Sequence, residues 1–142
     1  MASPAEIREG IASVLSTIPG LTVITTQPET PPATLPAAIV TPAFATFGSR
    51  PAGRGQNVWE WDILILTSGA DSGAGQAALD EFLVDSGPKS IVDAFRRNPQ
   101  MGLDVRTTAW VDRLESYGPR AQAGEYTRLM GAVLRLIVRT TG

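Results

Sequence analysis

The chain has 142 residues, of which 43% are hydrophobic and 18% charged, and its formal net charge is -2. A chain of this length and balance can bury a core without disulfides, and its charge offers no overall attraction for nucleic acid or an anionic membrane. Cysteine and histidine are both absent, which excludes thiolate nucleophiles, the usual structural zinc sites and histidine-dependent catalytic triads.

The first predicted element is an amphipathic helix. Ser3 and Glu6 have the spacing of a capping box, and Pro4 occupies the first helical position, where its missing amide hydrogen is tolerated. Apolar residues then recur at helical spacing: Ile7, Ile11, Val14, Leu15 and Ile18. Pro19 and Gly20 are predicted to end this helix.

A proline-rich region with two short strands follows. Leu21–Thr26 is rich in β-branched residues and is predicted to form a strand. Prolines between residues 27 and 36 favour an extended surface connection, after which Ala37–Thr41 is predicted as a second short strand. Residues 42–56 are rich in glycine and proline and are predicted to form a long loop. A loop of this length inside a compact domain is usually functional or mobile.

The clearest predicted strand is Asn57–Thr67. Its residues alternate between two sets, Trp59, Trp61, Ile63 and Ile65 on one side and Glu60, Asp62, Leu64 and Leu66 on the other. A period of two places each set on one face of a sheet, and this strand is longer than average.

Two short helices are predicted after this strand. Ser68–Gly75 is rich in glycine and serine and is predicted as a turn, in which Asp71 or Ser72 caps the first helix. Ser90 is predicted to open the second helix, and Asn98-Pro99 to end it.

The C-terminal part is predicted to be an antiparallel hairpin. Asp104–Glu115 alternates as a strand, Tyr117–Gly124 is predicted as a turn-rich tip, and Tyr126–Arg139 as a long final strand. Helices that cluster between strands favour an α+β fold. We therefore expect an antiparallel or mixed sheet of about five strands, flanked by the N-terminal helix and the helical pair, in a single domain over residues 1–142.

Few residues suggest catalysis. Glu60 and Asp62 share a strand face, as paired carboxylates in acid–base catalysis can, but strand alternation alone also places them together on a solvated or interfacial face. Gly69, Gly73 and Gly75 precede a helix without the lysine of a phosphate-binding loop, which favours a simple turn. We therefore predict no catalytic, cofactor-binding or metal-binding residue, and no enzyme.

The other candidates are residues that contact proteins. Arg50 and Arg54 in the predicted loop either bind acidic groups of a partner or serve solubility. Arg135 and Arg139 share a face of the final strand with Ile137, opposite the row of Met130, Leu134 and Leu136, and this face is either solvated or meets a neighbouring subunit. The three tryptophans are expected first in the core and second at an interface: Trp59, Trp61 and Trp110.

Five segments form a pattern over nearly the whole chain. They are the helix that ends in Ile18-Pro19-Gly20, the segment Leu35–Val40, the strand Trp59–Leu66, the segment Ser90–Phe95 and the hairpin from Tyr126 to Val138. In order and type, these elements resemble the tail terminator proteins of long-tailed phages, particularly phages that infect actinobacteria.

The resemblance implies a structural virion protein. Members of this family form a hexameric ring that caps the tail tube, ends tube polymerisation and joins the tail to the head. The implied partners are further copies of the chain, the major tail tube protein and the head connector or head-closure protein. DNA passes through the lumen without sequence-specific binding, no cofactor or membrane is involved, and the protein reaches the virion after assembly in the host cytoplasm.

A closed ring needs two different surfaces on each subunit. Exposed sheet edges and the loop 42–56 are the expected surfaces, with five arginines as candidate contacts: Arg50, Arg54, Arg128, Arg135 and Arg139. If the loop orders only on contact, the free protein stays monomeric until the tail end templates the ring. The alternatives are another neck, head-completion or tail tube protein, a small ligand-binding regulatory domain, and last an enzyme that uses Glu60 and Asp62.

Overall fold

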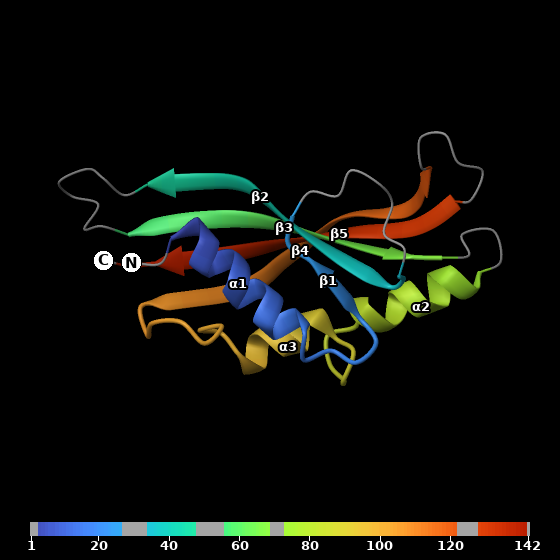
Figure 1. Ribbon diagram of the computed structural model, residues 1–142, viewed down its shortest axis with the longest axis horizontal. Coiled ribbons are helices and arrows are strands. Elements are labelled where there is room, and N and C mark those ends of the chain that lie inside the picture. Colours follow the sequence, from blue (N-terminus) through green and yellow to red (C-terminus); the bar gives the residue numbers. More distant parts are fainter. Residues whose placement is uncertain (1–2, 27–33, 48–55, 69–72, 122–127, 142) are drawn as a thin grey trace.

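The computed structural model of the protein describes residues 3–26, 34–47, 56–68, 73–121 and 128–141. It contains a mixed five-stranded sheet in the order β1-β2-β3-β5-β4, with three helices packed on one face (Figure 1). The elements are α1 (Pro4–Leu15), β1 (Thr22–Ile24), β2 (Ala37–Phe47), β3 (Asn57–Thr67), α2 (Ala74–Leu83), α3 (Ile91–Arg97), β4 (Thr107–Ala121) and β5 (Arg128–Thr140). The expected α+β class is therefore confirmed. None of the helices described has the length and apolar character needed to cross a membrane.

Helix α1 begins as the sequence predicts. The Ser3 hydroxyl accepts from the Glu6 amide, and the Ser3 amide donates to the Glu6 carboxylate, each at 3.2 Å. The predicted apolar stripe is buried against the sheet from Ile7 to Ile18. The helix itself ends earlier than predicted, at Leu15, and the hydroxyls of Ser16 and Thr17 donate to the carbonyls of Ala12 and Val14 in its last turn.

Strand β3 lies in the middle of the sheet, as its alternation suggests. It pairs antiparallel with both β2 and β5, while β1 pairs parallel with β2. Trp61, Ile63 and Ile65 are fully buried under the helices, in one core with residues of all three helices. The helix-covered face of the sheet is thus the main hydrophobic core of the domain.

Strand β2 is longer than predicted, which corrects the boundary of the expected loop 42–56. Residues 42–47 continue the strand opposite β3, and residues 48–55 lie outside the described part of the chain. The strand tolerates Pro42 because β1 reaches only to Ile39, so the outer edge of β2 has no described strand beside it at Pro42. An irregularity between Pro42 and Phe44 also falls there.

The C-terminal hairpin also differs from the prediction. The expected tip Tyr117–Gly124 is wrong for its first part, because residues 117–121 extend β4 to Ala121. Pro119 is compatible with this because β4 is the outermost strand of the sheet, where a missing amide hydrogen costs little. β4 starts at Thr107 and not at Asp104, and β5 is described from Arg128 to Thr140.

For the helical pair, the N-cap of α3 was predicted correctly and the N-cap of α2 was not. Ser90 caps α3 as predicted, with its hydroxyl accepting from the Asp93 amide at 3.0 Å. The expected cap of α2 by Asp71 or Ser72 is wrong, because the N-cap is Gly73 and no side chain caps that helix. Gly73 has φ 76°, in the left-handed region that favours glycine, which supports a simple turn before α2.

Candidate interaction surfaces

A cluster of charged side chains lies on the face of the sheet that carries no helix. It is called the charged cluster below and consists of Glu60 and Asp62 from β3, Asp112, Arg113 and Glu115 from β4, and Arg135 from β5. β3, β5 and β4 are adjacent in the sheet, and their register alone brings together residues that are far apart in the sequence.

Arg135 is the centre of the charged cluster. Its Nη1 donates to Glu60 Oε1 at 2.8 Å and its Nε to Asp62 Oδ1 at 2.9 Å, and Glu115 Oε1 lies 3.5 Å from Nε. Asp62 and Arg135 are direct cross-strand partners, a position in which opposite charges stabilise a sheet. Burial of the guanidinium lowers its pKa, but hydrogen bonds and charges from the three carboxylates outweigh this and raise the pKa of Arg135 overall.

Two irregularities in β4 bring the remaining charges into the cluster. The register shifts between Val111 and Arg113 and again between Leu114 and Ser116, so Asp112 and Glu115 are the extra residues. Arg113 lies directly opposite Arg135, which alone would be repulsive. The carboxylates of Asp112 and Glu115 compensate, because they lie 2.7 and 2.8 Å from the Arg113 guanidinium.

The charged cluster has more carboxylates than guanidiniums. Four carboxylates share two guanidiniums, which leaves a formal charge of about -2 on this part of the face. Glu60 and Asp62 are both held by Arg135, so this arrangement favours a structural or binding role over acid–base chemistry. Within the described ranges, no group of three or more acidic residues is arranged to hold a metal ion.

Apolar side chains flank the charged cluster. One row across the four strands β2, β3, β5 and β4 consists of Phe44, Glu60, Ile137 and Trp110, each opposite the next. Phe44 is 59% exposed and Trp110 is 36% exposed, although both are large apolar residues. The Arg139 guanidinium lies 5.4 Å from the Trp110 ring centroid. The helix-free face therefore combines exposed aromatic groups with excess negative charge, and aromatic residues are enriched at protein interfaces.

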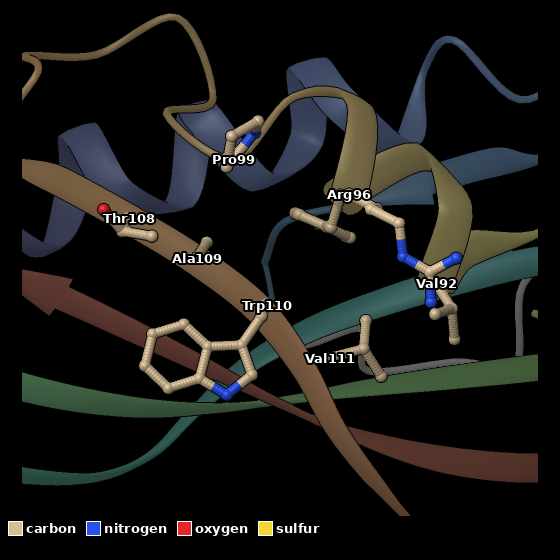
Figure 2. Close-up of a pocket in the computed structure, with 8 residues that line it drawn as sticks. Val92, Arg96, Pro99, Thr108, Ala109, Trp110 and Val111 are labelled. Atoms are coloured by element: carbon tan, nitrogen blue, oxygen red, sulfur yellow. The ribbon is translucent and has the colours of Figure 1, made fainter.

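A pocket of about 280 Å³ lies at the outer edge of β4 (Figure 2). It is lined by Val92, Phe95, Arg96 and Pro99 from α3 and the chain after it, and by Thr108, Ala109, Trp110 and Val111 from β4. Figure 2 shows Val92 and Arg96 on the side of β4 to which Val111 points, with the Trp110 ring on the other side of the strand. The amide of Ala109 donates to the Pro99 carbonyl at 2.7 Å, which ties this part of the β4 edge to the preceding chain.

The five predicted contact arginines have different surroundings. Arg135 is largely buried in the charged cluster, whereas Arg139 is exposed beside Trp110, and both lie on the helix-free face as predicted. Arg128 begins β5, but its side chain is outside the described set. Arg50 and Arg54 lie outside the described residues altogether.

The predicted tryptophan positions are confirmed in part, and one group of residues was missed. Trp61 is fully buried in the core and Trp59 packs beside it, while Trp110 is on the opposite, helix-free face. Sequence reasoning missed Asp112, Arg113 and Glu115, although three charges within five residues of a predicted strand are a usable sign of an irregular edge. Comparison of the chain with known protein families and with curated proteins found no match.

Proposed function

We propose that the protein is a structural virion component, a tail terminator that forms a hexameric ring. The ring caps the tail tube of a long-tailed phage, ends tube polymerisation and joins the tail to the head connector. The resemblance in sequence and element order motivates this assignment. The main structural observation in its favour is the helix-free face, which exposes aromatic side chains beside the charged cluster.

Unpaired sheet edges also support a subunit of an assembly. Among the described strands, β4 pairs with β5 alone, apart from the hydrogen bond of Ala109 to Pro99, and the part of β2 beyond Ile39 pairs with β3 alone. The edge of a sheet can add a strand of another chain through its backbone. Since the two edges lie on opposite sides of the sheet, each subunit offers two different surfaces, as a cyclic ring requires.

The charge of the protein is compatible with a channel for DNA. A strongly basic lumen would bind the phosphates of the passing duplex and slow it. The chain has a net charge of -2, and the charged cluster adds no positive patch to its face. DNA in the proposed ring therefore passes without sequence-specific binding.

Removal of the gene from a phage that carries it tests this function directly. We expect abnormally long tail tubes without attached heads in electron micrographs of the lysate, because tube growth is no longer stopped. Tails of normal length that lack only heads would overturn tail termination and favour the alternative of another neck or head-completion protein. Complementation with the intact gene is the control, and it should restore tail length.

The pocket beside Trp110 supports a second candidate, a small ligand-binding domain. Ligand pockets are concave and mostly apolar with a few polar groups, and Arg96 supplies a cation beside this one. A ligand in the pocket would change the fluorescence of Trp110. A change that Trp110→Phe abolishes, found in a screen of small carboxylates, would favour this candidate over the ring.

A further inference from the structure

The chain between α3 and β4, residues 98–106, forms an exposed tip on the helix-covered side of the sheet (Figure 1). Val105 in this tip is 76% exposed, the highest value among the large hydrophobic residues described. Its neighbour Arg106 is also exposed. The tip thus presents an apolar side chain next to a cation, away from the core.

The tip is held in a fixed conformation by its own hydrogen bonds. Asp104 accepts from the amide of Thr107 through its backbone and from the amide of Arg106 through its side chain, at 2.9 and 3.0 Å. The Arg106 carbonyl in turn accepts from the amide of Thr141 at 3.1 Å. A rigid exposed group loses little conformational freedom on binding, which favours recognition by a partner surface.

Close packing against α1 supports the other end of the tip. Met101 is buried, and a Cβ atom at Gly10 of α1 would lie only 3.1 Å from the Met101 Cβ atom. The absence of a side chain at Gly10 therefore permits this contact. The tip is consequently anchored at both ends while Val105 stays exposed.

The charges of this region are opposite to those of the helix-free face. Within the tip the formal charges of Asp104 and Arg106 cancel, and the positive sum of about +1 for residues 93–106 comes from Arg96 and Arg97 against Asp93 in the adjoining helix α3. The charged cluster carries about -2, or about -1 together with Arg139 beside Trp110, and is flanked by Phe44, Ile137 and Trp110. An apolar residue beside a cation on one surface thus matches apolar residues beside excess carboxylates on the other.

We propose that the tip of one copy docks on the helix-free face of the next copy, with Val105 against Phe44, Ile137 and Trp110 and with Arg106 toward the charged cluster. This inference rests on the proposed ring and names its subunit interface. The two surfaces lie on opposite sides of the sheet (Figure 1), so a molecule cannot satisfy both by itself. The contact is head-to-tail, and it gives a ring when the rotation between copies closes.

Two complementary variants test the interface. Val105→Asp places a charge on the tip and leaves the face intact, while Asp112→Lys changes the charge of the face and leaves the tip intact. Each variant alone should self-associate at least about tenfold more weakly than the wild type in sedimentation velocity over a concentration series. Their mixture should form a heterodimer that does not grow further, since one intact tip meets one intact face.

Matched controls use exposed residues at the end of α2, away from both surfaces. Val84→Asp repeats the change of the tip, and Glu81→Lys repeats the reversal of charge, with loss of only one exposed ion pair to Lys89. Both controls should associate like the wild type. Circular dichroism and thermal unfolding show whether each variant is folded.

Several results would overturn the interface. One is a wild type that stays monomeric at every concentration, and another is tip and face variants that associate like the wild type. A mixture that does not form heterodimers, as expected for a symmetric dimer contact, would overturn it as well. The gene-removal experiment is independent, because tail length reports termination whichever surface joins the copies.

Chemical cross-linking gives a second measurement that does not require weakened association. The chain has no cysteine, so Val105→Cys in one batch and Thr46→Cys in another place single thiols on the tip and on the helix-free face, respectively. A short bismaleimide should join the two in a mixture at least about tenfold faster than it joins Val105→Cys to Val84→Cys. Equal rates would contradict the proposed contact.

Discussion

The two faces of the sheet differ in how completely the protein covers its own apolar groups. On the helix-covered face, Trp61, Ile63 and Ile65 have no exposed surface. On the opposite face of the same strand, Glu60 and Asp62 are half-buried beside exposed aromatic residues of neighbouring strands. One strand with a period of two thus serves two purposes, since Trp61, Ile63 and Ile65 stabilise the domain while Glu60 and Asp62, unlike the buried Leu66, remain available to a partner.

Replacement of a tryptophan on each face should give the largest difference in the free energy of unfolding between the two faces. Trp61→Ala removes a fully buried ring from the core and should lower the free energy of unfolding by about 3–5 kcal/mol. Trp110→Ala removes a partly exposed ring that contacts Arg139 and should cost about 1 kcal/mol or less. Denaturant unfolding measures both. Similar losses would contradict the distinction between the faces.

Within the helix-free face, substitution of Arg135 should lower the free energy of unfolding more than substitution of Arg113. Arg135→Met leaves Glu60, Asp62 and Glu115 without their shared cation and should lower the free energy of unfolding by about 1–3 kcal/mol, less than a fully buried pair because water reaches the carboxylates. Arg113→Met is the matched control, since Arg113 is about half exposed, and it should cost about 1 kcal/mol or less. A larger loss for Arg113→Met would show that the centre of the cluster is wrongly assigned.

The smallest expected effect is on the pH dependence of stability and concerns Tyr117, at the rim of the helix-covered face. The Tyr117 hydroxyl donates to Asp80 of α2 at 2.7 Å, and this hydrogen bond, followed by burial, raises the pKa of Tyr117. The folded protein therefore holds this proton more tightly than the unfolded chain. Its contribution to stability is fully present below the unfolded pKa of about 10 and is lost as pH rises through the folded pKa.

Comparison with Tyr117→Phe isolates this contribution. Between pH 9 and pH 11 the wild type should lose more stability than the variant in thermal or denaturant unfolding. Parallel losses in the two proteins would show that the hydrogen bond to Asp80 does not persist in solution. The test leaves the helix-free face unchanged, because Tyr117 points to α2.

Patterns among residues close in the sequence predicted much of the structure of the helix-covered face. The cap at Ser3, the apolar stripe of α1 and the alternation of β3 are signs carried by neighbouring residues, and all three are confirmed. Pro42 and Pro119 were misjudged because proline usually breaks a strand. Both lie where one side of the strand has no described neighbour, a condition that depends on the order of strands and not on local sequence.

The helix-free face was harder to predict because its contacts are long-range. Asp62 and Arg135 are separated by 73 residues, and their contact depends on the register of β3 with β5. Asp112 and Glu115 join the cluster only through two irregularities in β4. Strict alternation would have placed Arg113 on the same face as Val111, so the run of charges indicates an irregular edge but does not predict which face the charges share.

Hydroxyl-radical footprinting tests most directly whether the helix-free face is the association surface. Modification of Phe44 and Trp110, both exposed in the single chain, should fall as the protein concentration rises into the range where copies associate. Exposed Val84, at the end of α2, should stay equally reactive. We expect selective protection of the two aromatic residues. Unchanged reactivity of both, in a sample that sedimentation shows to be associated, would contradict it.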